Sequence, residues 1–145
     1  MRTKEFMARL DHARIVAAIA AAEAKSSGEI RVFIQRGEMA DNPLRVAENK
    51  FMKLGMEKTA ERNAILILVV PRARKFAVVG DKGVHERCGA EFWEQLVATM
   101  RGHFQREAFT EALLAAIESA GDLLARHFPP QSDDRNELLD DIVEG

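Results

Sequence analysis

The chain lacks the features that would mark it as a disulfide-stabilised, zinc-binding or membrane-spanning protein. Cys88 is its only cysteine, so no disulfide can form within the chain and no cysteine cluster can hold zinc. No stretch approaches the ~20 apolar residues that a helix needs to cross a bilayer. The sequence therefore predicts a protein of a reducing compartment, with no membrane span.

The chain also has little net charge. Its 21 Lys and Arg against 23 Asp and Glu give a formal net charge of -2, so nothing draws the whole protein to nucleic acid or to anionic lipid. Residues 14–25, RIVAAIAAAEAK, resemble a signal peptide, but the run is short, contains Glu23 and also fits one face of a helix. We therefore expect a cytoplasmic protein that does not bind nucleic acid.

Several catalytic motifs are missing as well. The sequence has no Gly-x-Ser-x-Gly elbow, no phosphate-binding glycine-rich loop ending in Lys-Ser/Thr, and no His-Glu-x-x-His zinc pair. Cys88 follows an arginine and lies three residues after His85, a setting that favours a thiolate. One short turn does not establish a nucleophile, so the sequence points to no catalytic residue.

The sequence does contain well-separated extended patterns. Its 145 residues, 47% hydrophobic and 30% charged, are typical of one soluble globular domain. Residues 64–70, AILILVV, have no polar side chain, as expected of a central strand covered on both faces. Residues 29–36 alternate between apolar and polar side chains and predict a second strand. Residues 75–80 follow a short turn that allows only an antiparallel return.

Helical spacing surrounds these strands. The apolar pattern predicts helices over about residues 11–25, 43–54, 92–104 and 109–128. Because the chain passes through a helix between its first two strands, that connection should be a right-handed parallel crossover. The predicted fold class is therefore α/β, a three-layer α/β/α sandwich with a small mixed sheet.

The end of the chain differs in composition from the rest. Residues 131–145 carry six acidic residues and one arginine, and most such tails are solvated. We predict a single domain over residues 1–130 and an acidic, flexible C-terminal tail over residues 131–145. Deleting this tail should leave the melting temperature nearly unchanged, unless its apolar residues dock on the body.

The predicted topology brings three distant polar segments to one end of the sheet. The strand over residues 75–80 runs opposite to its neighbours, so its end lies beside the starts of the other two. The segments SSGE (26–29), ERN (61–63) and GDKGVH (80–85) should converge there. We call this end the polar rim. Its candidate ligand-binding residues are Glu29, Arg62, Asn63, Asp81, Lys82 and His85.

The residues of the polar rim have both a structural and a functional interpretation. Asp81 can cap the short turn that follows it, and Gly80 and Gly83 can form a structural turn by supplying positive φ angles. If the rim is a site, Asp81, His85 and Glu29 are possible metal ligands. Such oxygen-rich ligation favours Ca²⁺, Mg²⁺ or Mn²⁺, and the single histidine also admits Zn²⁺.

The opposite end of the sheet is a second candidate, because ligands of parallel sheets usually bind beyond the carboxyl ends of the strands. The polar residues expected at that end are Gln35, Arg36, Glu38, Asp41 and Arg72. The sequence itself does not choose between the two ends.

The sequence resembles the TPM-domain family, particularly its cytoplasmic bacterial branch without a signal peptide. The resemblance covers about residues 10–130 and rests on SGEI (27–30), TAERNAILILV (59–69), GDKGVHERCGAEFW (80–93) and HFQREAFTEALLAAI (103–117). The resemblance implies an α/β/α sandwich, in agreement with the fold predicted from the apolar patterns.

On function the resemblance implies less. Proteins similar to this domain take part in photosystem repair, receptor modulation and the bacterial envelope, and some are described as weak, metal-assisted acid phosphatases. Exported members typically read Gly-Tyr-Gly-Leu-Glu-Gly where this chain has GDKGVH at residues 80–85. The acidic residues of the exported branch therefore have no counterparts here, and only Asp81, Gly83 and His85 fit the cytoplasmic pattern.

Two functions follow as hypotheses. The first is a protein-binding or assembly module with another protein as its partner, which the missing catalytic motifs favour. The second is a weak metal-assisted phosphatase, in which Asp81, Glu29 and His85 would bind a divalent cation and Arg62 would steady a phosphate. Whether the chain is an enzyme stays open at this stage. Melting with and without each ion would separate the two, since binding to the native state raises the melting temperature.

Overall fold

The computed structural model describes residues 1–130 and 142–145 of the chain. The helices in these residues are α1 (Thr3–Ala8), α2 (His12–Ala24), α3 (Pro43–Lys53), α4 (Lys82–His85), α5 (Ala90–Gln105) and α6 (Phe109–His127), with short 3₁₀ turns at Met56–Lys58 and Pro71–Ala73. The strands are β1 (Glu29–Ile34), β2 (Ala64–Val70), β3 (Lys75–Gly80) and β4 (Ile142–Glu144).

The strands form one mixed sheet in the order β3-β2-β1-β4. β1 is parallel to β2 and to β4, and β3 is antiparallel to β2. Glu29 at the start of β1 lies opposite Ala64, while Gly80 at the end of β3 lies opposite Ile65. The end of β3 therefore meets the starts of β1 and β2, which confirms the predicted parallel crossover and hairpin.

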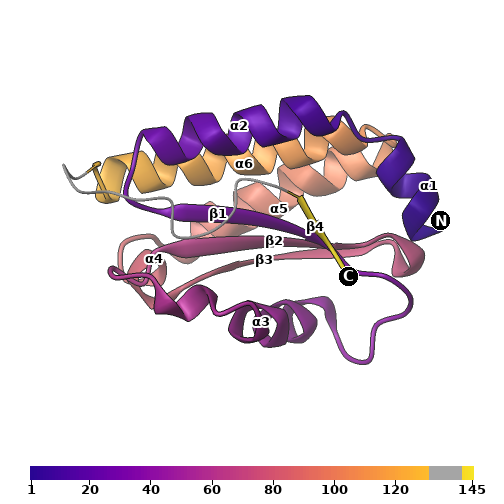
Figure 1. Cartoon of the computed structure of the whole chain (residues 1–145), viewed down its shortest axis with the longest axis horizontal. Helices are drawn as coiled ribbons and strands as arrows, with labels where there is room; N and C mark the ends of the chain where they lie inside the picture. Colours follow the sequence, from indigo (N-terminus) through magenta and orange to yellow (C-terminus); the bar gives the residue numbers. More distant parts are fainter. Residues whose placement is uncertain (131–141) are drawn as a thin grey trace.

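Helices cover both faces of the sheet, so the predicted three-layer α/β/α sandwich is correct (Figure 1). α2, α5 and α6 lie on one face and α3 lies on the other. Each face has its own apolar core: Ile65 and Ile67 of β2 belong to the larger one, and Leu66 and Leu68 to the smaller. Because successive side chains of a strand point to opposite faces, β2 can be entirely apolar only when both faces are covered.

Local sequence signals set where the main helices begin. Asp11 accepts a hydrogen bond from the Arg14 amide at 3.2 Å, and Asn42 caps α3 in the same way. Pro43 occupies the first turn of α3, where its missing N–H costs nothing. α1 has no predicted counterpart, because six residues show too little periodicity. In the part of the chain that the structure describes, no helix is both long and apolar enough to cross a membrane.

The chain ends in a strand, which the sequence did not predict. β4 pairs in parallel with β1, on the side of β1 away from β2. Ile142 packs against the larger core and Val143 against the smaller. The prediction of a flexible tail is therefore wrong for residues 142–144, which join the sheet. The rest of the predicted tail before β4, residues 131–141, lies outside the described residues.

Candidate functional site

The three polar segments do meet at the polar rim. The Gly83 amide donates a hydrogen bond to the Arg62 carbonyl at 2.8 Å, which joins the GDKGVH segment to ERN. Asn63 Nδ2 donates to Ser27 Oγ at 3.1 Å, which joins ERN to SSGE. The sheet topology alone was enough to predict this convergence, because it fixes which strand ends lie together.

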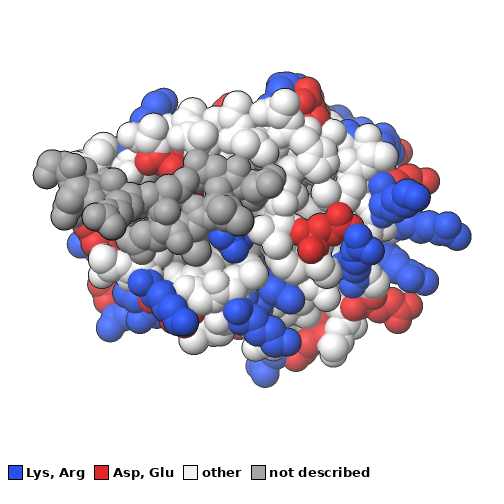
Figure 2. Space-filling view, in the orientation of Figure 1, with Lys and Arg blue, Asp and Glu red and all other residues white. Residues whose placement is uncertain are grey.

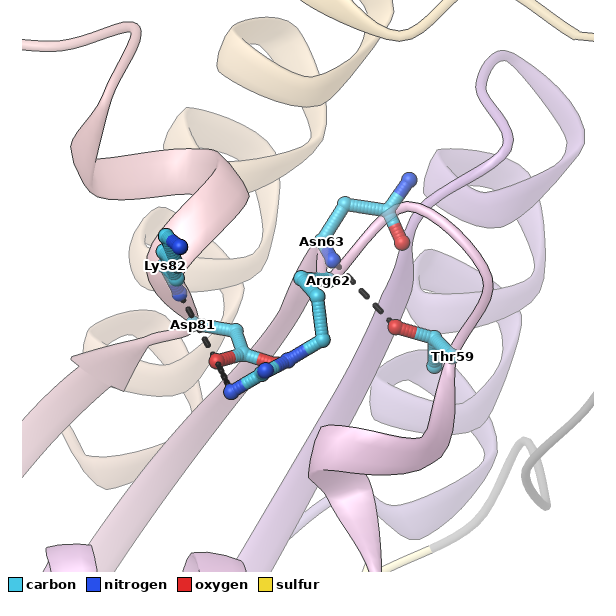
Figure 3. Close-up of polar contacts among 5 residues, drawn as sticks. All are labelled: Thr59, Arg62, Asn63, Asp81 and Lys82. Carbon is cyan, nitrogen blue, oxygen red and sulfur yellow. Dashed lines mark hydrogen bonds and ion pairs between the residues drawn. The ribbon is translucent and has the colours of Figure 1, made fainter.

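Arg62 and Asp81 form a bidentate ion pair at the centre of the polar rim (Figure 3). Arg62 Nε donates to Asp81 Oδ2 and Nη2 donates to Oδ1, each at 2.7 Å. The Asp81 side chain is 6% exposed, whereas that of Arg62 is 45% exposed. The hydrogen bond to Asp81 raises the pKa of Arg62 above its already high value. One guanidinium group therefore engages both oxygens of a buried carboxylate.

Asp81 also starts α4, as the structural interpretation proposed. Its Oδ1 accepts the Lys82 amide at 2.7 Å, while its carbonyl accepts the amides of Val84 and His85 at 3.0 and 3.1 Å. The capping role is confirmed. The Lys82 side chain is exposed and does not take part in this network.

The positive φ angles predicted for Gly80 and Gly83 are wrong. Neither residue has one, because Gly80 ends β3 and Gly83 lies within α4. Both glycines provide space instead. A Cβ on Gly83 would overlap the carbonyl oxygens of Glu61 and Arg62, and a Cβ on Gly80 would lie 2.7 Å from the Trp93 ring. The turn needs glycine for close approach and not for backbone conformation.

The positive φ at this rim belongs to Arg62, at 52°. This conformation is unfavourable for a residue with a Cβ. Thr59 supports it, since its carbonyl accepts the Arg62 amide at 3.2 Å. Its Oγ1 also accepts the Asn63 amide at 3.2 Å (Figure 3). This turn places the Arg62 guanidinium against Asp81. The sequence did not predict it, because position 62 is neither glycine nor asparagine.

The remaining candidates of the polar rim differ in how far they are buried. Glu29 and Asn63 are buried, at 3% and 1% exposure. His85 is exposed, with its ring centroid 5.2 Å from that of Trp93. Among the described residues, no three of His, Cys, Asp and Glu group closely enough to hold a metal ion. Glu29, Asp81 and His85 are thus not a preassembled ligand set, and binding of a divalent cation by them stays a prediction.

The surroundings of Cys88 do not favour its thiolate form. Desolvation raises the pKa of its thiol, although contact with Trp93 works in the opposite direction. A raised pKa keeps the thiol protonated near neutral pH, where the thiolate would be the reactive form. The basic neighbours noted in the sequence do not outweigh this burial.

The opposite end of the sheet contains a pocket of about 680 Å³ that no motif revealed. Residues from α1, the turn between β2 and β3, α5 and the start of α6 line it. The five polar residues expected at this end do not belong to its lining. Two of them are engaged elsewhere: Arg36 pairs with Glu144 at 2.5 Å, and Asp41 pairs with Arg45 at 3.5 Å.

Comparison with known proteins agrees with this architecture. The family profile described as the TPM domain matches residues 2–123. The chain belongs to the TPM domain family. The match includes the polar rim and most of α6, so both ends of the sheet lie within the domain.

Solved structures give the same fold. The BA42 protein from the psychrophilic bacterium Bizionia argentinensis is 34% identical, with a TM-score of 0.84 over 92% of this TPM domain chain and 92% of that chain. The N-terminal domain of the cg2496 protein from Corynebacterium glutamicum is 16% identical, with a TM-score of 0.63 over 88% of this chain and 80% of that chain. An N-terminal domain from P. gingivalis is 15% identical, with a TM-score of 0.63 over 79% and 76%. No curated protein matches.

Proposed function

We propose that this TPM domain is a protein-binding accessory module that accepts a β-strand of another protein at the outer edge of β1. The observation that carries this proposal is the pairing of β4 with that edge. Beyond β4, the Gly145 amide donates to the Ile34 carbonyl at 3.1 Å, and the Gly145 carbonyl accepts the Arg36 amide at 2.6 Å. In the proposed mechanism, the chain's own last residues occupy the edge until a partner strand replaces them.

The dimensions of β4 support replacement. β4 has three residues, whereas strands of globular proteins usually have ~5 to 6. Ile142 and Val143 are half-buried and Glu144 is exposed, so a small apolar area holds this strand in place. β1, in contrast, is buried along its whole length. A longer partner strand would extend the ladder towards the start of β1. There it would replace Glu23, whose Oε2 accepts a hydrogen bond from the Ile30 amide at 2.7 Å.

The polar rim gives less support to the metal-assisted phosphatase. Both oxygens of Asp81 are held by Arg62, and Oδ1 also caps α4. For Asp81 to bind a cation, it would first have to leave both partners, and separating a buried carboxylate from its counter-ion is costly. The geometry therefore favours the binding module.

A peptide-binding assay tests whether the β1 edge accepts a strand. The probe is a fluorescent peptide with the sequence of residues 138–145, LLDDIVEG. The receptor is the full chain carrying Val143→Pro. In this register the backbone amide of Val143 faces β1, as that of Gly145 does. Proline has no amide hydrogen, so it removes one hydrogen bond of the ladder and frees the edge. We expect the peptide to bind Val143→Pro more tightly than wild type, by fluorescence anisotropy.

Two controls make this assay specific. Val143→Ala keeps the backbone amide that pairs with β1, so it should bind the peptide more weakly than Val143→Pro does. A peptide N-methylated at the position of Val143 should not bind, because it cannot complete the ladder. Equal binding of the methylated peptide, or no binding to Val143→Pro, would rule out strand addition. Proteins captured from a native extract by Val143→Pro should then be released by the unmodified peptide.

A further inference from the structure

The pocket at the end of the sheet opposite the polar rim has the size and the wall of a small-molecule site. Its volume of about 680 Å³ falls within the ~300 to 1,000 Å³ of ligand pockets. Phe76 of β3, Phe104 of α5 and Phe109 of α6 line it. Their ring centroids are 5.0 Å apart for Phe76 and Phe104, and 6.2 Å apart for Phe104 and Phe109. These rings form a continuous aromatic wall.

Three cations share this pocket with the rings. Arg74, Lys75 and Arg101 all line it and are all exposed. In the described residues, none of the three forms an ion pair. Figure 2 shows Lys and Arg gathered, with some Asp and Glu among them, at the end where Figure 1 places α1 and the turn after β2. An apolar wall thus lies beside positive charges that form no ion pair with any residue the structure describes.

The acidic lining residue does not cancel these charges. Glu107 pairs with Arg9 at 2.8 Å. That hydrogen bond is the main cause of the lowered pKa of Glu107, and the charge of Arg74 contributes less. Because Arg9 already compensates Glu107, the pocket keeps a positive field that attracts anions.

Backbone strain marks the same place. The described residues contain three positive-φ residues other than glycine, and two of them, Arg74 at 54° and Glu107 at 57°, line this pocket. Glycine or asparagine adopts this conformation at lower cost. Strained residues of this kind concentrate at binding sites. A positive charge that contributes to binding would explain why arginine, which does not favour this backbone conformation, occupies position 74.

We propose that this pocket binds a small carboxylate with an apolar body, such as a single-chain fatty acid. The aromatic wall would bury the apolar body. Arg74 and Arg101 would pair with the carboxylate, since a guanidinium group matches its two oxygens. This site is separate from the β1 edge, so the proposal does not depend on strand addition.

Calorimetric titration of the full chain with dodecanoate, kept below its micellar concentration, tests the site. We expect one molecule per chain. A triple variant, Arg74→Asn with Lys75→Gln and Arg101→Gln, should weaken binding at least tenfold, and asparagine is chosen because it tolerates a positive φ. Arg72→Gln is the matched control. Arg72 is exposed in the same turn but lies outside the lining, so its variant should bind as wild type does.

Two further measurements address the apolar part and the sign of the charge. Val97 of α5 is half-buried in the lining, so Val97→Trp should fill the pocket and abolish binding while the circular dichroism spectrum is retained. Dodecyltrimethylammonium, which has the same chain and the opposite charge, should not bind to wild type. The proposal is overturned if wild type does not bind dodecanoate, if the triple variant binds it unchanged, or if the cationic amphiphile binds equally well.

Discussion

At the polar rim, Arg62 and Asp81 pair with each other, whereas the charged residues of the pocket at the opposite end of the sheet line a cavity. Asp81 lies 6% exposed inside the fork of Arg62, and its hydrogen bonds hold a turn together. Arg74, Lys75 and Arg101 form no ion pairs within the described chain. A cluster of polar residues is therefore not by itself a binding site. What matters is whether the structure has already used their hydrogen bonds and charges.

The two ends should therefore respond differently to substitution. Changes at the polar rim remove interactions that hold strands and α4 together, so they should reduce the free energy of unfolding. Changes at the pocket remove charges that stabilise little, so they should alter binding while stability stays the same or rises.

The largest effect should come from Gly83→Ala at the polar rim. A Cβ there would overlap two carbonyl oxygens of the backbone, which cannot move aside as a flexible side chain would. Overpacking of this kind should lower the free energy of unfolding by about 2–3 kcal/mol. Lys82→Ala, at an exposed neighbouring position, should change it by less than about 0.5 kcal/mol. Urea unfolding measures both, and equal midpoints would contradict the close packing.

Asp81 should show the next largest effect, with alanine worse than asparagine. Asp81→Ala removes the cap and the partner of Arg62, at a cost of about 1–2 kcal/mol. Asp81→Asn keeps an oxygen that can cap α4, so it should cost less. Calorimetry with and without Mn²⁺ is the measurement, and exposed Glu86→Ala is the control. If Mn²⁺ raises the melting temperature of wild type but not that of Asp81→Asn, the result would support a metal site at Asp81.

A smaller effect of opposite sign should appear at the pocket. Arg74→Gly relieves a positive φ of 54° and should raise the free energy of unfolding by about 0.5–1 kcal/mol. The same change should weaken dodecanoate binding. Arg72→Gly is the matched control, because Arg72 has no positive φ, and it should destabilise by a similar amount. Two variants of equal stability would show that Arg74 is not strained.

The smallest effect concerns pH. The pKa of Glu107 is lowered from its ordinary 4.5, chiefly by the hydrogen bond from Arg9. A group with a lowered folded-state pKa stabilises the fold above its ordinary pKa, and this contribution is lost as pH falls through the lowered value. When the pH falls from 6 to 3, the melting temperature of wild type should thus decrease slightly more than that of Glu107→Gln. Parallel pH curves for the two proteins would contradict the pairing.

The sequence predicted the sheet because its signals are local and strong. The apolar run AILILVV and the short turn after it specify β2 and β3, and the helical spacing before residue 64 makes β1 parallel. α1 and β4 were missed because six and three residues are too short to show a period.

The candidate site was predicted only in outline. Topology brought the polar segments together, but the Arg62–Asp81 pair depends on a left-handed turn at Arg62, where arginine gives no conformational signal. The pocket draws its lining from segments as far apart in the sequence as Phe6, Phe76 and Phe109. No short stretch of sequence contains such a site, so only the folded arrangement reveals it.

The position of β4 also sets the order in which the sheet can assemble. β2 and β3 are joined by a short turn, but Val32 of β1 pairs with Ile142, more than one hundred residues later. Closing so long a loop is slow and costly in entropy, so β4 should acquire amide protection last during refolding. During synthesis, the Ile34 carbonyl and the Arg36 amide lack their Gly145 partners until that residue has left the ribosome. For that interval, a neighbouring nascent chain competes for the same hydrogen bonds.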